Sequence, residues 1–203
     1  MRNLLLFAAS IALSPVAGSA APCMPGTLAD YIALGSSGCT LGNLQVAAFA
    51  YQGKAGGGAP EITADQISVT PVLAPTGNFA LQFTAPWGVQ SGQRQLSQIT
   101  YRALSPSANV QIEQVRLDGS GFQAGMFSSV LVNQAMATPA TTLDLQVYLK
   151  CGEFCRSQTS SLLGITPPTP MLVVADRVTL QSKMGSAALA GFADWFSVCL
   201  PCV

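Results

Sequence analysis

The feature that most constrains the fold of this chain is a series of short segments in which apolar and polar residues alternate. The clearest is residues 143–150, where Leu143, Leu145, Val147 and Leu149 alternate with Asp144, Gln146, Tyr148 and Lys150. Successive side chains of a β-strand point to opposite faces of its sheet. The pattern therefore predicts a strand with one buried side and one side that faces solvent.

Similar segments recur along the chain, with turn-forming residues between them. They lie at residues 44–51, 66–74, 79–84, 95–104, 110–117, 127–134, 172–180 and 188–198. Within 110–117 the apolar phase slips by one residue between Ile112 and Val115, which predicts a β-bulge. No segment long enough for a crossover helix separates these strands. We therefore expect an all-β protein, an antiparallel β-sandwich, formed as a single domain by residues 21–203.

One short helix is predicted near the start, from Thr27 to Leu34. Thr27 can cap the first turn, and Asp30 three residues later resembles the acidic member of a capping box. Gly35 can adopt the left-handed conformation that ends a helix. A helix this short does not persist alone in water, so packing or a crosslink must hold it.

The first 20 residues have the pattern of a secretory signal peptide. A short basic start at Met1 to Asn3 precedes an apolar run from Leu4 to Leu13, and small residues follow at Gly18-Ser19-Ala20. The apolar run is too short to span a membrane. Because Pro22 precedes the first cysteine, we expect no lipid anchor after cleavage. The mature protein is predicted to be secreted, in the periplasm or the extracellular space, where disulfides form.

All six cysteines follow the predicted signal peptide: Cys23, Cys39, Cys151, Cys155, Cys199 and Cys202. A Cys23–Cys39 bridge would bracket the predicted helix and contribute about 3 kcal/mol in the chain-entropy model. For the other four, the local pairs 151–155 and 199–202 are the first choice, and cross-pairing between them is the second. A redox dithiol at Cys199–Cys202 and a four-cysteine zinc site are weaker alternatives.

Four stretches resemble a known family of proteins. They are TLADYIALGSSGCTLGNLQVAAFAY (27–51), ISVTPV (67–72), FTAPWGVQSGQ (83–93) and QITYRAL (98–104). In these stretches the chain resembles bacterial secreted proteins of the PEP-CTERM, exosortase-associated type. The resemblance covers the first half of the mature chain and implies a β-rich extracellular domain of unassigned function. The C-terminal Pro-Glu-Pro, apolar helix and basic end of that family are not found here, so membrane sorting is not implied.

The residue types exclude several kinds of chemistry. The chain has no histidine, so Ser-His-Asp and Cys-His sites and the histidine-containing zinc sites cannot form. The carboxylates show no catalytic pattern, and each is interpreted as a turn residue or a solvated strand residue. The formal net charge is zero and the basic residues are scattered along the sequence. We therefore expect no basic face, no cofactor or metal, and neither nucleic acid nor an anionic membrane as a partner.

The aromatic residues supply the remaining candidate site. Trp87 is flanked by Pro86 and Gly88, which predicts a surface loop and a ligand-facing ring. Trp195 lies next to Phe192 and Phe196 in a pattern that favours burial. The first hypothesis is a secreted, non-enzymatic structural or surface-associated protein that self-associates or contacts extracellular polysaccharide. The second is a carbohydrate-binding module that uses Trp87 and nearby tyrosines, and the third is a glycoside hydrolase.

Overall fold

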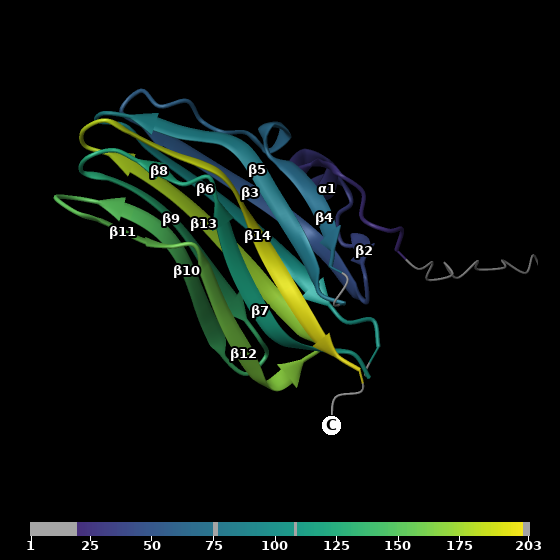
Figure 1. Ribbon diagram of the computed structural model, residues 1–203. Coiled ribbons are helices and arrows are strands. Elements are labelled where there is room, and N and C mark those ends of the chain that lie inside the picture. Colours follow the sequence, from purple (N-terminus) through teal and green to yellow (C-terminus); the bar gives the residue numbers. More distant parts are fainter. Residues whose placement is uncertain (1–19, 75–76, 108, 201–203) are drawn as a thin grey trace, which may run out of the picture.

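The computed structural model describes residues 20–74, 77–107 and 109–200. Two antiparallel, seven-stranded sheets pack face to face (Figure 1). This confirms the predicted all-β fold with one short α-helix near the start. Apart from Ala20, the predicted signal peptide lies outside the described residues. No helix among the residues described is long and apolar enough to cross a lipid bilayer.

The first sheet, here called sheet A, has the strand order β11-β10-β9-β13-β6-β3-β2. Its strands are β11 (Cys155–Gln158), β10 (Thr142–Cys151), β9 (Ser128–Ala137), β13 (Met171–Ser182), β6 (Arg94–Leu104), β3 (Leu44–Gly56) and β2 (Cys39–Leu41). All neighbours are antiparallel. The strands are long, so the solvent-facing side of sheet A carries several rows of side chains.

The second sheet, sheet B, has the order β1-β4-β5-β14-β7-β12, and β8 pairs with β14. Its strands are β1 (Gly26–Thr27), β4 (Ser68–Leu73), β5 (Phe79–Gln90), β14 (Ser186–Cys199), β7 (Gln111–Ser120), β12 (Ser160–Thr169) and β8 (Gln123–Ala124). The sequence pattern did not indicate β12, because its residues are mostly exposed and contain Pro167 and Pro168.

The alternation read from the sequence gives the observed faces of the strands. In β10, Leu145 and Val147 are buried while Gln146 and Lys150 are exposed. The bulge predicted in residues 110–117 is confirmed: Ile112 pairs with Val198 and Gln114 with Ser197, so Glu113 has no opposite residue in β14. The extra residue restores the inward phase, and Val115 and Leu117 are fully buried.

A continuous set of aromatic rings fills much of the space between the sheets. Phe49 stacks on Tyr101 with ring centroids 5.1 Å apart, and Phe83 stacks on Phe192 at 5.0 Å. Offset or stacked pairs of this kind add to the free energy gained by burying the rings. The rings come from β3 and β6 of sheet A and from β5 and β14 of sheet B, so they join the two sheets.

The short helix α1 (Leu28–Ala33) begins as the sequence predicts. The Asp30 amide donates to Thr27 Oγ1 at 3.2 Å, and the Thr27 amide donates to Asp30 Oδ2 at 2.8 Å, which is a capping box. Gly35 follows with a φ of 59°. Leu28 and Tyr31 are the buried residues of the helix, so α1 is anchored in the core. A single-turn 3-10 helix, η1 (Ala64–Gln66), precedes β4.

Two of the predicted disulfides are confirmed. Cys23 is bonded to Cys39 and Cys151 to Cys155, with Cα atoms 4.9 and 4.0 Å apart. The second bond removes two of the thiolates that a four-cysteine zinc site needs. Cys199 is also disulfide-bonded, but the predicted 199–202 pair includes Cys202, which lies outside the described residues.

Candidate functional site

Trp87 is not a surface residue, so the prediction that its ring faces a ligand is wrong. It lies within β5, is 2% exposed, and its indole nitrogen donates to Ser97 Oγ at 3.0 Å. The strand continues through Pro86 because the pairing of β5 with β14 changes register between Leu189 and Gly191. At such an irregularity the missing amide hydrogen of proline is tolerated. Trp87 therefore does not present its ring to solvent, where a ligand could contact it.

Trp195 was expected to be buried, but it lies on the outer face of sheet B. Phe192 and Phe196 point into the core, but Trp195 is in the other phase of β14 and is half-buried on the outer face of sheet B. The Arg116 guanidinium carbon lies 4.8 Å from the centre of its ring, and Arg116 Nε is 3.0 Å from Asp118 Oδ2. The ring is thus covered by an ion-paired arginine.

Two carboxylates lie in the core, although the sequence suggested solvated positions. Asp176 on β13 and Asp194 on β14 are both 0% exposed, and Tyr101 donates to Asp194 Oδ2 at 2.6 Å. Burial raises the pKa of Asp194 to about 6. Burial and the nearby Asp194 carboxylate raise the pKa of Asp176 well above its usual value. The two groups are closed off between the sheets, so a glycoside cannot reach them.

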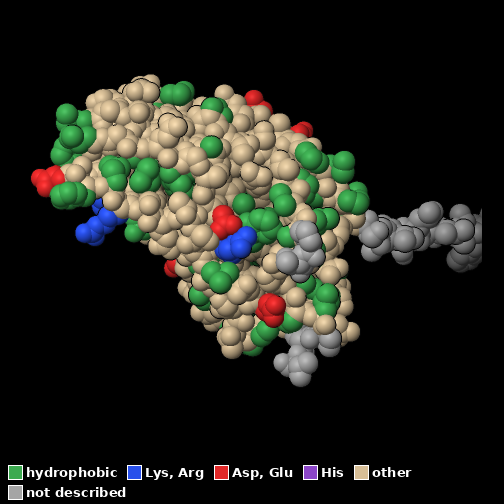
Figure 2. Space-filling view, viewed as in Figure 1, with side chains coloured by type: hydrophobic (Ala, Val, Ile, Leu, Met, Phe, Trp, Pro, Cys, Tyr) green, Lys and Arg blue, Asp and Glu red, His purple; other side chains and the backbone are tan. Residues whose placement is uncertain are grey.

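The outer face of sheet A gathers most of the basic residues of the chain. Its exposed cations are Lys54, Arg94, Arg102, Lys150, Arg156 and Arg177. They come from different strands and are distant in sequence, but each occupies an outward position. The expectation that no face would be basic is therefore wrong. The face seen in Figure 2 is largely uncharged by comparison, with one basic side chain beside an acidic one near its centre.

The strand register explains how these cations come together. One row across sheet A consists of Gly56, Arg94, Gln181, Ser129, Lys150 and Arg156, each opposite the next. A second, parallel row consists of Gln52, Gln98, Arg177, Asn133 and Gln146. Lys150 and Arg156 stand directly opposite each other, an arrangement of like charges that is unfavourable without a counter-ion.

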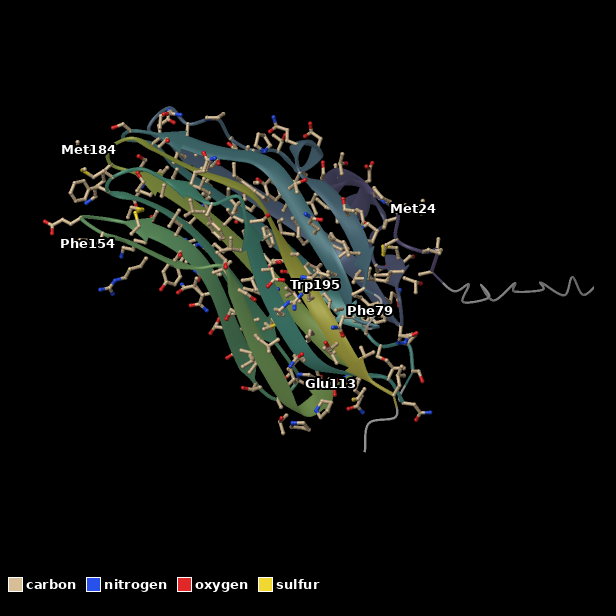
Figure 3. All side chains as sticks on the ribbon, viewed as in Figure 1. Met24, Phe79, Glu113, Phe154, Met184 and Trp195 are labelled. Atoms are coloured by element: carbon tan, nitrogen blue, oxygen red, sulfur yellow. A yellow bond between two sulfur atoms is a disulfide. The ribbon has the colours of Figure 1, made fainter. Side chains whose placement is uncertain are left out.

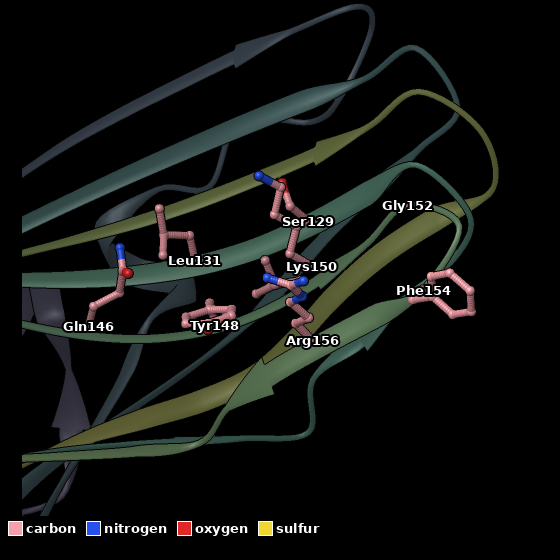
Figure 4. A pocket seen from close by; sticks show the side chains of 9 residues that line it. Ser129, Leu131, Gln146, Tyr148, Lys150, Gly152, Phe154 and Arg156 are labelled. Atoms are coloured by element: carbon pink, nitrogen blue, oxygen red, sulfur yellow. The ribbon is translucent and has the colours of Figure 1, made fainter.

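Three shallow hollows lie side by side on this face, and together they are here called the basic groove. Their volumes are about 610, 520 and 430 Å³. Gln146 lines the first and second hollows, and Arg177 lines the second and third, so each hollow is next to the following one. Figure 4 shows Tyr148, Lys150 and Arg156 around the first hollow. From β11 to β3 the groove crosses five strand spacings, roughly 24 Å.

The cations of the basic groove have no ion-pair partners in the part of the chain that the structure describes. The one ion pair found there within 4.0 Å is Arg116–Asp118 on sheet B. Asp144 lines the second hollow and Glu61 the third, and they are the carboxylates that reach the groove. Its polar lining is otherwise neutral: for example, Gln146 Nε2 donates to Asn133 Oδ1 at 2.7 Å.

The described residues contain no group of three or more histidine, cysteine, aspartate or glutamate side chains that could hold a metal ion. The fold and the groove together define a disulfide-bonded β-sandwich with one strongly basic sheet face. The local sequence does not predict which cations share this face. Arg102 and Arg177 show this most clearly, because their sequence neighbours do not distinguish them from scattered surface residues. The register of the sheet was needed to place them on one face.

Comparisons with known proteins place the chain in no family. No family model matches it, and no curated protein sequence matches it. Among solved structures, it is similar to the enzymatically active domain of tailspike protein 4 from bacteriophage CBA120, with a TM-score of 0.29 and 10% identity. The match covers 80% of this chain and 21% of that chain. A similarity of this size carries no functional argument.

Proposed function

We propose that this is a secreted, non-enzymatic, surface-associated protein that binds a polyanionic polysaccharide in its basic groove. The observation that supports this most is the set of cations on the outer face of sheet A that have no ion-pair partner among the described residues. The two disulfides, the predicted signal peptide and the resemblance to secreted proteins of the PEP-CTERM type favour an extracellular location.

The charge distribution favours an anionic ligand. The whole chain is formally neutral, yet the described lining of the basic groove contains the cations Arg94, Arg177, Lys150 and Arg156, and its carboxylates are Asp144 and Glu61. Cations held close together by strand pairing repel one another, and a bound polyanion would relieve that repulsion. An anionic chain would also be attracted from a distance, most strongly at low ionic strength.

The shape and polarity of the groove favour a polysaccharide. It is open and runs across the strands for roughly 24 Å, which suits an extended chain better than a small molecule. Amides and hydroxyls such as those of Gln98, Asn133 and Thr179 can both donate and accept hydrogen bonds with sugar hydroxyls. Tyr148 offers an aromatic ring to one sugar face. Single-stranded nucleic acid is less well matched, since its binding sites stack successive bases on several aromatic rings.

The groove carboxylates do not favour glycoside hydrolysis. That reaction uses two carboxyl groups roughly 5 to 9 Å apart. Asp144 is on β10, and Glu61 lies in the third hollow beside β3, four strand spacings away, or about 19 Å. We therefore propose that the groove binds its polysaccharide without cleaving it.

Titration calorimetry with polygalacturonate tests this function. The wild-type protein should bind it, and should not bind the neutral polymer dextran. Arg177→Gln removes the cation shared by two hollows and should weaken binding about fivefold at low salt, since an exposed charge pair is worth up to about 1 kcal/mol. Arg116→Gln changes the net charge equally on sheet B and should leave binding unchanged.

Two outcomes would overturn the proposal. The first is equal binding of dextran and polygalacturonate, and the second is equal weakening by both arginine variants. Tighter binding of single-stranded DNA than of any acidic polysaccharide would reassign the groove to nucleic acid.

A further inference from the structure

One end of the sandwich exposes large apolar side chains on several neighbouring loops. Phe154, in the β10–β11 turn, is 84% exposed, and Met184 in the β13–β14 turn is also exposed. Met126 and Phe127, between β8 and β9, are exposed as well. Figure 3 shows Phe154 and Met184 at the same end of the molecule, with Met24 at the opposite end. These four residues are called the apolar tip below.

Hydrogen bonds join two of the loops of the apolar tip, and a disulfide closes the third. The Lys183 amide donates to the Phe127 carbonyl at 3.1 Å, and Ser128 Oγ donates to the Met184 carbonyl at 3.0 Å. The Cys151–Cys155 bond closes the turn that carries Phe154. Phe127 has a φ of 53°, a conformation that a bulky residue adopts only where its surroundings impose it. The apolar side chains are thus presented to solvent by a fixed backbone.

Cations lie directly behind the apolar tip. Lys150 and Lys183 line a hollow of about 230 Å³ together with Phe127. Arg156 stands opposite Lys150 and lines the neighbouring hollow with Phe154. Glu153 is the one carboxylate of the turn between Cys151 and Cys155. This end of the molecule therefore combines the apolar tip with a basic margin, which consists of Lys150, Arg156 and Lys183.

We propose that the apolar tip inserts into the surface of a lipid bilayer that contains anionic phospholipids. Phenylalanine and methionine can enter the boundary between headgroups and acyl chains, while lysine and arginine remain with the phosphates. The tip consists of separate projecting turns, which a deformable bilayer can surround more readily than a rigid protein surface can. The margin of Lys150, Arg156 and Lys183 matches the negative surface potential of such a bilayer.

The protein with its disulfides intact can be sedimented with vesicles to test this. It should bind vesicles of one part phosphatidylglycerol to two parts phosphatidylcholine. The double variant Phe154→Ser, Met184→Ser should lower the partition coefficient more than about tenfold, because two buried apolar side chains are lost. Lys183→Gln should lower it about fivefold. Met24→Ser, a comparable change at the far end, should have no effect.

A second measurement does not depend on the loss of binding. In Phe154→Trp, emission from the new tryptophan should shift to shorter wavelength on addition of the anionic vesicles, beyond any change in the wild type, and brominated lipid should quench it. Unchanged emission, equal loss of binding in Met24→Ser, or sedimentation of the protein without vesicles would overturn the proposal. Arg177→Gln should leave vesicle binding intact, which separates this test from that of the basic groove.

Discussion

Asp194 illustrates how a single residue can couple the core of this molecule to pH. Its carboxyl group is fully buried, accepts a hydrogen bond from Tyr101, and lies near Asp176 and Gln134. The sequence shows only an acid that interrupts an apolar segment. Because that acid is in phase with Phe192 and Phe196, the alternation of β14 places it inward. The same alternation places Trp195 outward, so both corrections have one cause.

The raised pKa of Asp194 makes stability depend on pH. A carboxyl group with a folded-state pKa of about 6, above the usual 3.8, binds its proton more tightly in the folded state. Its contribution is therefore fully present below about pH 4 and is lost as the pH rises towards 6. Asp176, whose pKa is also raised, acts in the same direction. From Asp194 alone, the free energy of unfolding should fall by about 2 kcal/mol between pH 4 and pH 6, and the rest of the contribution is lost above pH 6.

Urea unfolding at a series of pH values measures this dependence. In Asp194→Asn, the part of the fall between pH 4 and pH 6 that comes from Asp194 should disappear, and the part that comes from the buried Asp176 should remain. Phe196→Leu, a change of a buried neighbour that does not titrate, should lower stability by a similar amount at every pH. A wild-type protein whose stability rises over this interval would contradict the assignment of a raised pKa.

At the scale of elements, the features that depend on local sequence were predicted correctly, and a feature that depends on the pairing of distant strands was not. Period-two alternation located most strands, and the phase slip located the bulge at Glu113. The capping box of Thr27 and Asp30 located the helix. The prediction of a surface loop at Pro86 and Gly88 was wrong. Whether a strand can contain a proline depends on how the neighbouring strand pairs with it. The neighbouring strand, β14, lies about a hundred residues further along the chain. Its register with β5 is fixed only by the tertiary structure.

The disulfide that brackets α1 should contribute measurably to stability. The Cys23–Cys39 bond spans 16 residues, so Cys23→Ser, Cys39→Ser should lower the free energy of unfolding by about 3 kcal/mol. The Cys151–Cys155 bond spans 4 residues, and the matching double variant should lose about 2 kcal/mol. Denaturant unfolding monitored by circular dichroism gives both values. A larger loss from the shorter loop would show that loop-closure entropy does not govern these bonds.

At the scale of the whole molecule, the central property is the separation of charge between the two sheet faces. The chain is formally neutral, yet in the part that the structure describes the cations without ion-pair partners lie mainly on sheet A, and the ion pair Arg116–Asp118 lies on sheet B. Composition and local sequence predict neither arrangement, because each cation is isolated in its own strand. The rows that contain Arg94, Arg177 and Lys150 exist only once the strand order and register are fixed.

The most direct test of this account is to map where an anionic oligosaccharide contacts the protein. Amide chemical shifts would be measured by NMR during titration with a short oligogalacturonate. The perturbed residues should cluster on the outer positions of β10, β9, β13 and β6, around Gln146, Asn133 and Arg177. Perturbations centred on the outer face of sheet B, or no perturbation on sheet A at saturating ligand, would contradict it.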